Sequence, residues 1–125
     1  MKRHENRIRI ISVLYQHLLL DKDITECMFS YSDEPFEKFE NDILEDIKVN
    51  EDNYISNISS YLKDWSFNRL NLVDQAILLL AVSEMTQGIN DKAVIIDEAI
   101  NLAKEYSDET SYKYINGVLD RYAVN

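Results

Sequence analysis

NLVDQAILLLAVSEMTQG, residues 71–88, is the stretch of the sequence that decides the fold. Asn71 and Asp74 form an Asn-x-x-Asp pair of the kind that caps a helix at its N-terminus. Gly88 is a residue type that commonly follows the last turn of a helix. Between these signals, the apolar run 76–82 surrounds nearly the whole helix, which predicts a buried helix at the centre of the domain, ending near Gln87.

The segments on both sides of this stretch also have helical periodicity. In the first, Ile8, Ile11, Tyr15 and Leu18 are spaced 3, 4 and 3 residues apart, which places them on one face of a helix. Residues 21–34 have no clear period and are expected to be a connection, and Pro35 after three polar residues favours a helix start. The predicted helices besides the central one cover residues 3–20, 35–48, 54–62, 91–106 and 108–122.

The pair Asn116-Gly117 conflicts with the last of these helices, because Asn-Gly is also a typical two-residue hairpin turn. The flanking segments are short and no partner strands are evident, so we favour a helix. A glycine inside a helix costs about 1 kcal/mol relative to alanine, and close approach of another helix is the usual compensation. We therefore expect a second helix to pack near Gly117.

The composition supports an all-α fold in a single domain. The 125 residues have a mass of 14.7 kDa and include just 2 Gly and 1 Pro, too few for the turns of a sheet protein. A single cysteine, Cys27, excludes an internal disulfide. The N-terminus lacks the apolar run of a signal peptide, and the longest apolar run has seven residues, so we expect a cytoplasmic protein without a membrane span.

The sequence contains no recognisable catalytic motif. It lacks a glycine-rich phosphate loop and a G-x-S-x-G elbow, and neither His4 nor His17 has metal-ligand spacing with Cys27. Its many acidic pairs are most simply explained as solvated helix faces. We therefore expect neither an enzyme nor a cofactor or metal site.

The charge of −10 is unevenly distributed along the chain. Residues 1–20 carry +3, residues 21–52 carry −9 and residues 53–125 carry −4. Because charges act within about a Debye length, roughly 8–10 Å, a basic end can bind anions although the whole chain is acidic. Arg3 and Arg7 lie one turn apart in line with Leu14, so we expect them to project beyond the core and suit phosphate contact. The alternative is a solvated helix end without a ligand.

Several blocks of the chain resemble the NusB family of transcription antitermination factors. The N-terminal match is Arg7 followed by Leu14-Tyr15-Gln16, and the resemblance covers residues 1–20 and 61–122. The C-terminal blocks are Trp65-x-x-x-Arg69-Leu70, Val73-Asp74-x-Ala76-Ile77-Leu78 with Ala81 and Glu84, Ala93-Val94-x-Ile96-x-Glu98-Ala99, Leu102-Ala103-Lys104, and Ser111-x-Lys113-Tyr114-Ile115-Asn116-Gly117-Val118-Leu119-Asp120.

The resemblance implies an all-α protein of six to seven helices in two small packed bundles, roughly residues 1–64 and 65–125. It implies a partner, the ribosomal small-subunit protein NusE, with which family members bind the boxA element of nascent RNA, mainly in ribosomal RNA operons, within the RNA polymerase antitermination complex. The resemblance is also compatible with a homodimer, because some family members self-associate. The RNA contacts carried over are Lys2, Arg3, Arg7, Tyr61, Thr110, Ser111 and Tyr114, while Asp74 matches a position that faces NusE.

Two alternatives to an RNA-binding antitermination subunit remain at this point. The same fold could serve as a protein-only interaction module whose RNA binding has been eroded by acidity. A NusB-like domain also forms the N-terminal part of one RNA methyltransferase family, although we expect no cofactor-binding domain after Asn125.

Overall fold

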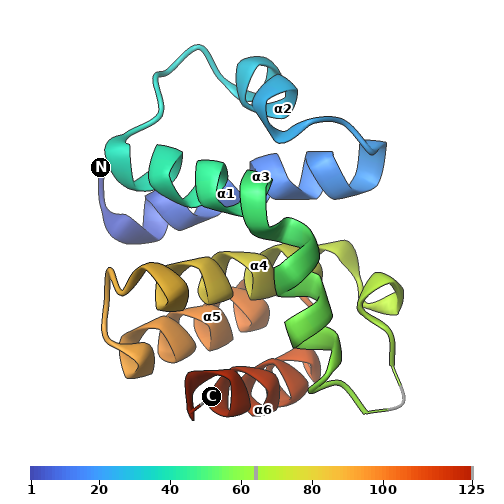
Figure 1. Ribbon diagram of the computed structural model, residues 1–125. Coiled ribbons are helices and arrows are strands. Elements are labelled where there is room, and N and C mark those ends of the chain that lie inside the picture. Colours follow the sequence, from blue (N-terminus) through green and yellow to red (C-terminus); the bar gives the residue numbers. More distant parts are fainter. Residues whose placement is uncertain (64, 125) are drawn as a thin grey trace.

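The computed structural model describes residues 1–63 and 65–124, and in these ranges every regular element is helical. Helix α4 (Leu72–Gln87) lies at the centre and contacts α1, α3, α5 and α6 (Figure 1). The Asn71 side chain accepts a hydrogen bond from the Asp74 backbone N–H at 2.9 Å, and Gly88 ends the helix with φ +63°. Residues 74–85 are all buried, which confirms the predicted central helix.

Helices α1 (Arg3–Leu20) and α2 (Ile24–Tyr31) begin the chain. The bounds of α1 agree with the prediction, whereas α2 lies inside the segment expected to be a connection. The Asp23 side chain caps α2 by accepting from the Thr25 backbone N–H at 2.8 Å, and Ile24 and Cys27 are buried. With eight residues, α2 is too short to show a clear period in sequence.

Helix α3 (Lys38–Ser59) replaces two predicted helices, so the expected break between residues 48 and 54 was wrong. Ile43, Ile47, Tyr54 and Ile58 are all buried on it at spacings of 4, 7 and 4, which is one continuous face. The polar residues between Ile47 and Tyr54 are mostly exposed and do not interrupt the helix. The helix begins after Pro35, at a capping box in which the Glu37 backbone N–H donates to the side chain of Glu40 at 2.7 Å.

The C-terminal half contains the short 3₁₀ helix η1 (Phe67–Arg69) and two further helices, α5 (Lys92–Tyr106) and α6 (Ser111–Val124). Asn116 and Gly117 lie within α6, as predicted. The expected close approach of another helix to Gly117 was wrong, because a Cβ placed there would meet nothing within 4 Å among the described residues. No described helix combines the length and apolarity needed to cross a membrane.

The described helices form two layers, with α1, α2 and the start of α3 above α4, α5 and α6 in the view of Figure 1. Helix α3 runs from the first layer to the second and contacts both α1 and α6. The division into bundles of residues 1–64 and 65–125 stays a prediction, and both Asp64 and Asn125 lie outside the described residues.

Candidate functional site

A groove of about 680 Å³ opens between α6 and the segment that joins α3 to α4. This segment lies at the right of Figure 1, where α6 also begins. The apolar residues that line the groove include Leu62, Leu70 and Val118. The remaining residues that line it are Tyr61, Lys63, Trp65, Arg69, Asn71, Asp108, Thr110, Ser111, Lys113, Tyr114, Gly117 and Arg121.

The groove is basic although the chain is acidic. Lys63, Arg69, Lys113 and Arg121 line it, which is four of the six lysines and arginines between residues 53 and 125, and the acid among the described lining residues is Asp108. The Arg121 guanidinium donates a hydrogen bond to the Tyr61 carbonyl oxygen at 2.9 Å, which ties α6 to the opposite wall. Clustered guanidinium and ammonium groups with focused positive potential are suited to phosphate groups.

Three aromatic side chains share the groove with these cations. Trp65 is 59% exposed, while Tyr61 and Tyr114 are half-buried. The Tyr61 ring meets Tyr122 edge-on, with centroids 6.4 Å apart and the planes at 82°. Aromatic faces beside basic side chains are typical of sites where unpaired bases stack and phosphates are neutralised.

The Tyr114 side chain is held in place by the buried side chain of Asp74. Its hydroxyl donates a hydrogen bond to Asp74 Oδ2, and burial together with this carboxylate raises the pKa of Tyr114, so the phenol stays neutral. Asp74 itself is fully buried, and its Oδ1 has no hydrogen-bond partner in the described part of the chain. The expectation that Asp74 faces a protein partner therefore needs correction, because its carboxylate lies in the interior.

The N-terminal cations predicted to contact RNA lie away from the groove. Arg7 is 4% exposed, and its Nε and Nη2 atoms each donate to Glu84 at 2.8 Å. Burial opposes the charged form, but the paired Glu84 carboxylate more than offsets it, so the pKa of Arg7 is raised. The prediction that Arg7 projects beyond the core was wrong, because the α1 face that carries it packs against α4.

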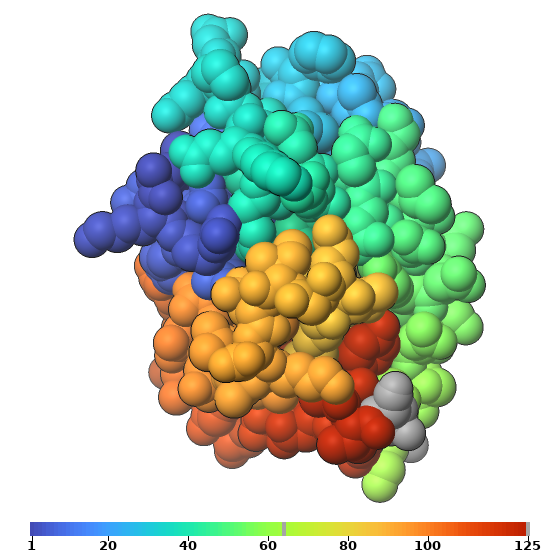
Figure 2. All heavy atoms as spheres, turned by 60° about the vertical axis from the view of Figure 1, so that its left-hand side comes forward, coloured from blue at the N-terminus to red at the C-terminus, as the bar shows by residue number. Residues whose placement is uncertain are grey.

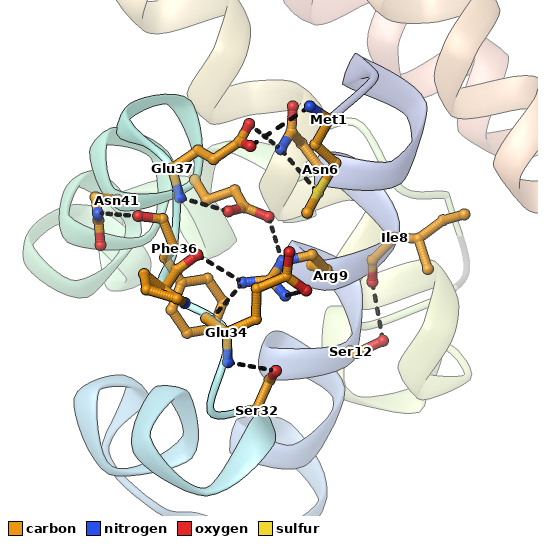
Figure 3. Close-up of polar contacts among 12 residues, drawn as sticks. Met1, Asn6, Ile8, Arg9, Ser12, Ser32, Glu34, Phe36, Glu37 and Asn41 are labelled. Carbon is orange, nitrogen blue, oxygen red and sulfur yellow. Dashed lines mark hydrogen bonds and ion pairs between the residues drawn. The ribbon is translucent and has the colours of Figure 1, made fainter.

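Arg9 is buried in a second network at the start of α3. Its Nε donates to Glu40 at 2.7 Å and its Nη2 to the backbone oxygens of Glu34 and Pro35, while its guanidinium lies 4.5 Å from the Phe36 ring centroid (Figure 3). Beside it, Asn6 donates to Glu37 at 3.0 Å (Figure 3). Half of the arginines and lysines in the first 20 residues are therefore internal ion pairs rather than surface charge.

Arg3 is exposed, as predicted, and so is Lys2. The Arg3 guanidinium lies 3.9 Å from the Phe39 ring centroid, in a shallow hollow bordered by Glu37, Asp42 and Ile89. Figure 2 shows this face, where the first residues project beside the start of α3 and the turn after α4. This end of the molecule and the groove share no lining residue, so the predicted RNA contacts fall into two separate regions.

The structure thus brings together four of the seven predicted RNA contacts, Tyr61, Thr110, Ser111 and Tyr114. Thr110 is exposed, whereas Ser111 is buried and accepts a hydrogen bond from Ser107 at 3.1 Å. The sequence reasoning missed the four groove cations, because they were hidden in a segment with a net charge of −4. For two of the four, Lys113 and Arg121, the available signal was their helical spacing with Gly117 on α6.

The described side chains contain no group of three or more His, Cys, Asp or Glu residues placed to hold a metal ion. Ionisable side chains with shifted pKa values outside the groove belong to structural contacts. Hydrogen bonding to Glu98 raises the pKa of His4, and hydrogen bonding to Glu51 raises that of His17.

Comparison with known proteins places this geometry in a family. The model of the NusB family matches residues 4–124. The chain is 36% identical over 124 residues to the transcription antitermination protein NusB of Staphylococcus aureus (strain JH9), covering 95% of this chain and 96% of the relative. A solved structure of T. maritima NusB superposes with a TM-score of 0.88 at 35% identity, covering 100% of this chain and 92% of that one.

A further solved structure shows the same fold at lower identity. It contains the antitermination factors NusB and NusE in complex with dsRNA, with a TM-score of 0.80 and 22% identity over 99% of this chain and 98% of that one. At this identity the likeness shows that the two chains share the same arrangement of helices.

Proposed function

Because this chain belongs to the NusB family of transcription antitermination factors, we propose that it binds boxA-containing RNA together with the ribosomal protein NusE. Its place is then in the RNA polymerase antitermination complex, where the pair supports transcription of ribosomal RNA operons. NusE and RNA are both present with the NusB-like fold in one solved complex, which supports the choice of partners.

The observation that carries this proposal is the basic, aromatic groove on an acidic protein. Lys63, Arg69 and Lys113 supply charge for phosphates, and Tyr61, Trp65 and Tyr114 supply ring faces for bases. Base–aromatic stacking contributes about 1–3 kcal/mol per base and works best on single strands. The groove can therefore contribute affinity for an unpaired RNA segment despite a net charge of −10.

The acidic charge of the rest of the chain favours a partner protein that is basic. Residues 21–52 carry −9, and complementary charge accelerates association and orients the partner. Since Asp74 is buried, a NusE contact in its neighbourhood would be made by exposed residues around it. Lys2 and Arg3 remain proposed RNA contacts at the other end of the molecule. Arg7 is instead proposed to stabilise the fold through its ion pair with Glu84.

The proposal is tested by titrating boxA-containing RNA and a scrambled RNA of equal length with this protein, in the presence and absence of NusE. We expect the mixture with NusE to bind boxA RNA more tightly than the scrambled RNA, and the protein alone to bind weakly and with strong salt dependence. Equal affinity of the mixture for both RNAs would contradict the proposal.

The second candidate is a protein-only interaction module. The burial of Arg7 and Arg9 favours it, because it reduces the arginines and lysines exposed among the first 20 residues to Lys2 and Arg3. This candidate predicts that the protein binds NusE with unchanged affinity when RNA is added, and that substituting groove cations does not affect any activity of the complex.

A further inference from the structure

Gly117 occupies the middle of α6, a position where glycine destabilises a helix relative to alanine. Glycine is normally retained in such a place because its φ is positive or because another backbone approaches closely. The glycine with positive φ in the described chain is Gly88, so Gly117 has ordinary helical geometry. A Cβ at Gly117 would meet nothing within 4 Å among the described residues, so packing against this part of the chain does not require glycine there.

The open space beside Gly117 is the groove. Gly117 follows Tyr114 by three residues and precedes Arg121 by four, so all three line the same wall of α6. The missing side chain leaves a bare stretch of helix backbone between an aromatic ring and a guanidinium group. A side chain at this position would extend into the volume that a ligand must occupy.

We infer that Gly117 is an RNA-binding residue of the groove, where one nucleotide of single-stranded RNA packs directly on the α6 backbone between Tyr114 and Arg121. This inference rests on the proposed function, because it takes RNA as the occupant of the groove. Tyr114 offers its ring to the base and Arg121 lies on the side where an adjoining phosphate would pass. The helix gives up stability at Gly117 so that the nucleotide can approach the backbone.

This role makes an unusual prediction, in which the folded protein becomes more stable while binding becomes weaker. Gly117→Ala is expected to raise Tm by about 2–6 °C, since alanine is the better helix former. The same variant is expected to weaken binding of boxA-containing RNA in the presence of NusE by at least about fivefold, because the methyl group overpacks the contact. Gly117→Leu should weaken it further.

Asn116→Ala is the matched control. Asn116 is the preceding residue of α6, it does not line the groove, and its replacement also improves helix propensity. We expect a higher Tm with RNA affinity within twofold of the unsubstituted protein. NusE affinity, measured without RNA, should be unchanged in all three variants.

The outcomes separate this inference from the proposed function. If the unsubstituted protein with NusE does not bind boxA-containing RNA, both are overturned. If it binds and the Gly117→Ala and Gly117→Leu variants bind equally well, the inference alone is overturned. A lower Tm in Gly117→Ala would also overturn it, because glycine would then be required by the fold.

Discussion

The hydroxyl of Tyr114 on α6 donates a hydrogen bond to the buried carboxylate of Asp74 in the first turn of α4. This contact joins a wall of the groove to the central helix. It also fixes the position of the Tyr114 ring in the groove wall, because the hydroxyl at the end of the side chain is held by Asp74. An Asp-to-Tyr pair of this kind couples the stability of the fold to the shape of the candidate site.

Tyr114→Phe is expected to lower the free energy of unfolding by about 1–3 kcal/mol, because Asp74 would lose the partner of Oδ2 while Oδ1 has none among the described residues. Urea denaturation measures this loss. Tyr15→Phe, at an exposed tyrosine of α1, should change stability by less than about 0.5 kcal/mol. Equal losses in the two variants would show that the contact with Asp74 contributes nothing.

Arg7→Ala is expected to destabilise the protein by about 3–5 kcal/mol, because it leaves Glu84 buried without its charge partner. Replacing both residues, as Arg7→Met with Glu84→Leu, should recover most of the loss. Arg3→Ala, at an exposed position on the same helix, should cost less than about 1 kcal/mol. A fully stable Arg7→Ala variant that fails to bind RNA would restore Arg7 as a direct RNA contact.

Local patterns predicted the parts of the fold that depend on neighbouring residues. The cap at Asn71, the stop at Gly88 and the apolar run between them all act within one helix, so the sequence was sufficient for α4. Helix α3 was harder, because its buried face skips from Ile47 to Tyr54 over a stretch of mostly polar residues. A search for unbroken apolar spacing divides such a helix in two. In the structure it is one helix, whose side chains pack on two different layers.

The site depended on pairings that the sequence could not reveal. Arg7 was correctly placed in line with Leu14, but its role depends on Glu84, which lies 77 residues away and meets it across α1 and α4. The groove depends equally on long-range contacts, since Arg69 and Lys113 come from separate segments. The family resemblance predicted Tyr61 and Tyr114 as RNA contacts, whereas the clustering of the four cations around them became visible when the helices were assembled.

Stability should depend on pH through His17. Its Nε2 lies 2.8 Å from Glu51 Oε2, and this hydrogen bond is the main cause that raises the pKa of His17 above 6.5. A raised pKa in the folded state means that the contact stabilises fully below about pH 6.5 and is lost as the pH rises through the folded-state value. The difference in unfolding free energy between the unsubstituted protein and His17→Gln should therefore shrink as the pH rises above about 6.5.

Denaturation at several pH values, together with NMR titration of the His17 ring, measures this effect. Taking the difference from His17→Gln removes the contribution of His4, whose pKa is also raised. Glu51→Gln should lower the pKa of His17, because it removes the largest of the contacts that raise it. A stability difference that stays constant or grows with pH would contradict the role assigned to this pair.

The salt dependence of RNA binding tests whether the groove cations meet phosphates. Each phosphate contact on a single strand contributes about −0.7 to the slope of log K against log salt concentration. Lys113→Gln should therefore weaken binding of boxA-containing RNA by the complex with NusE and make that slope shallower by about 0.7. Lys22→Gln removes the same charge from the exposed segment between α1 and α2, outside the groove, and should leave the slope unchanged. A slope that both variants alter equally would show that RNA responds to the total charge of the protein rather than to the groove.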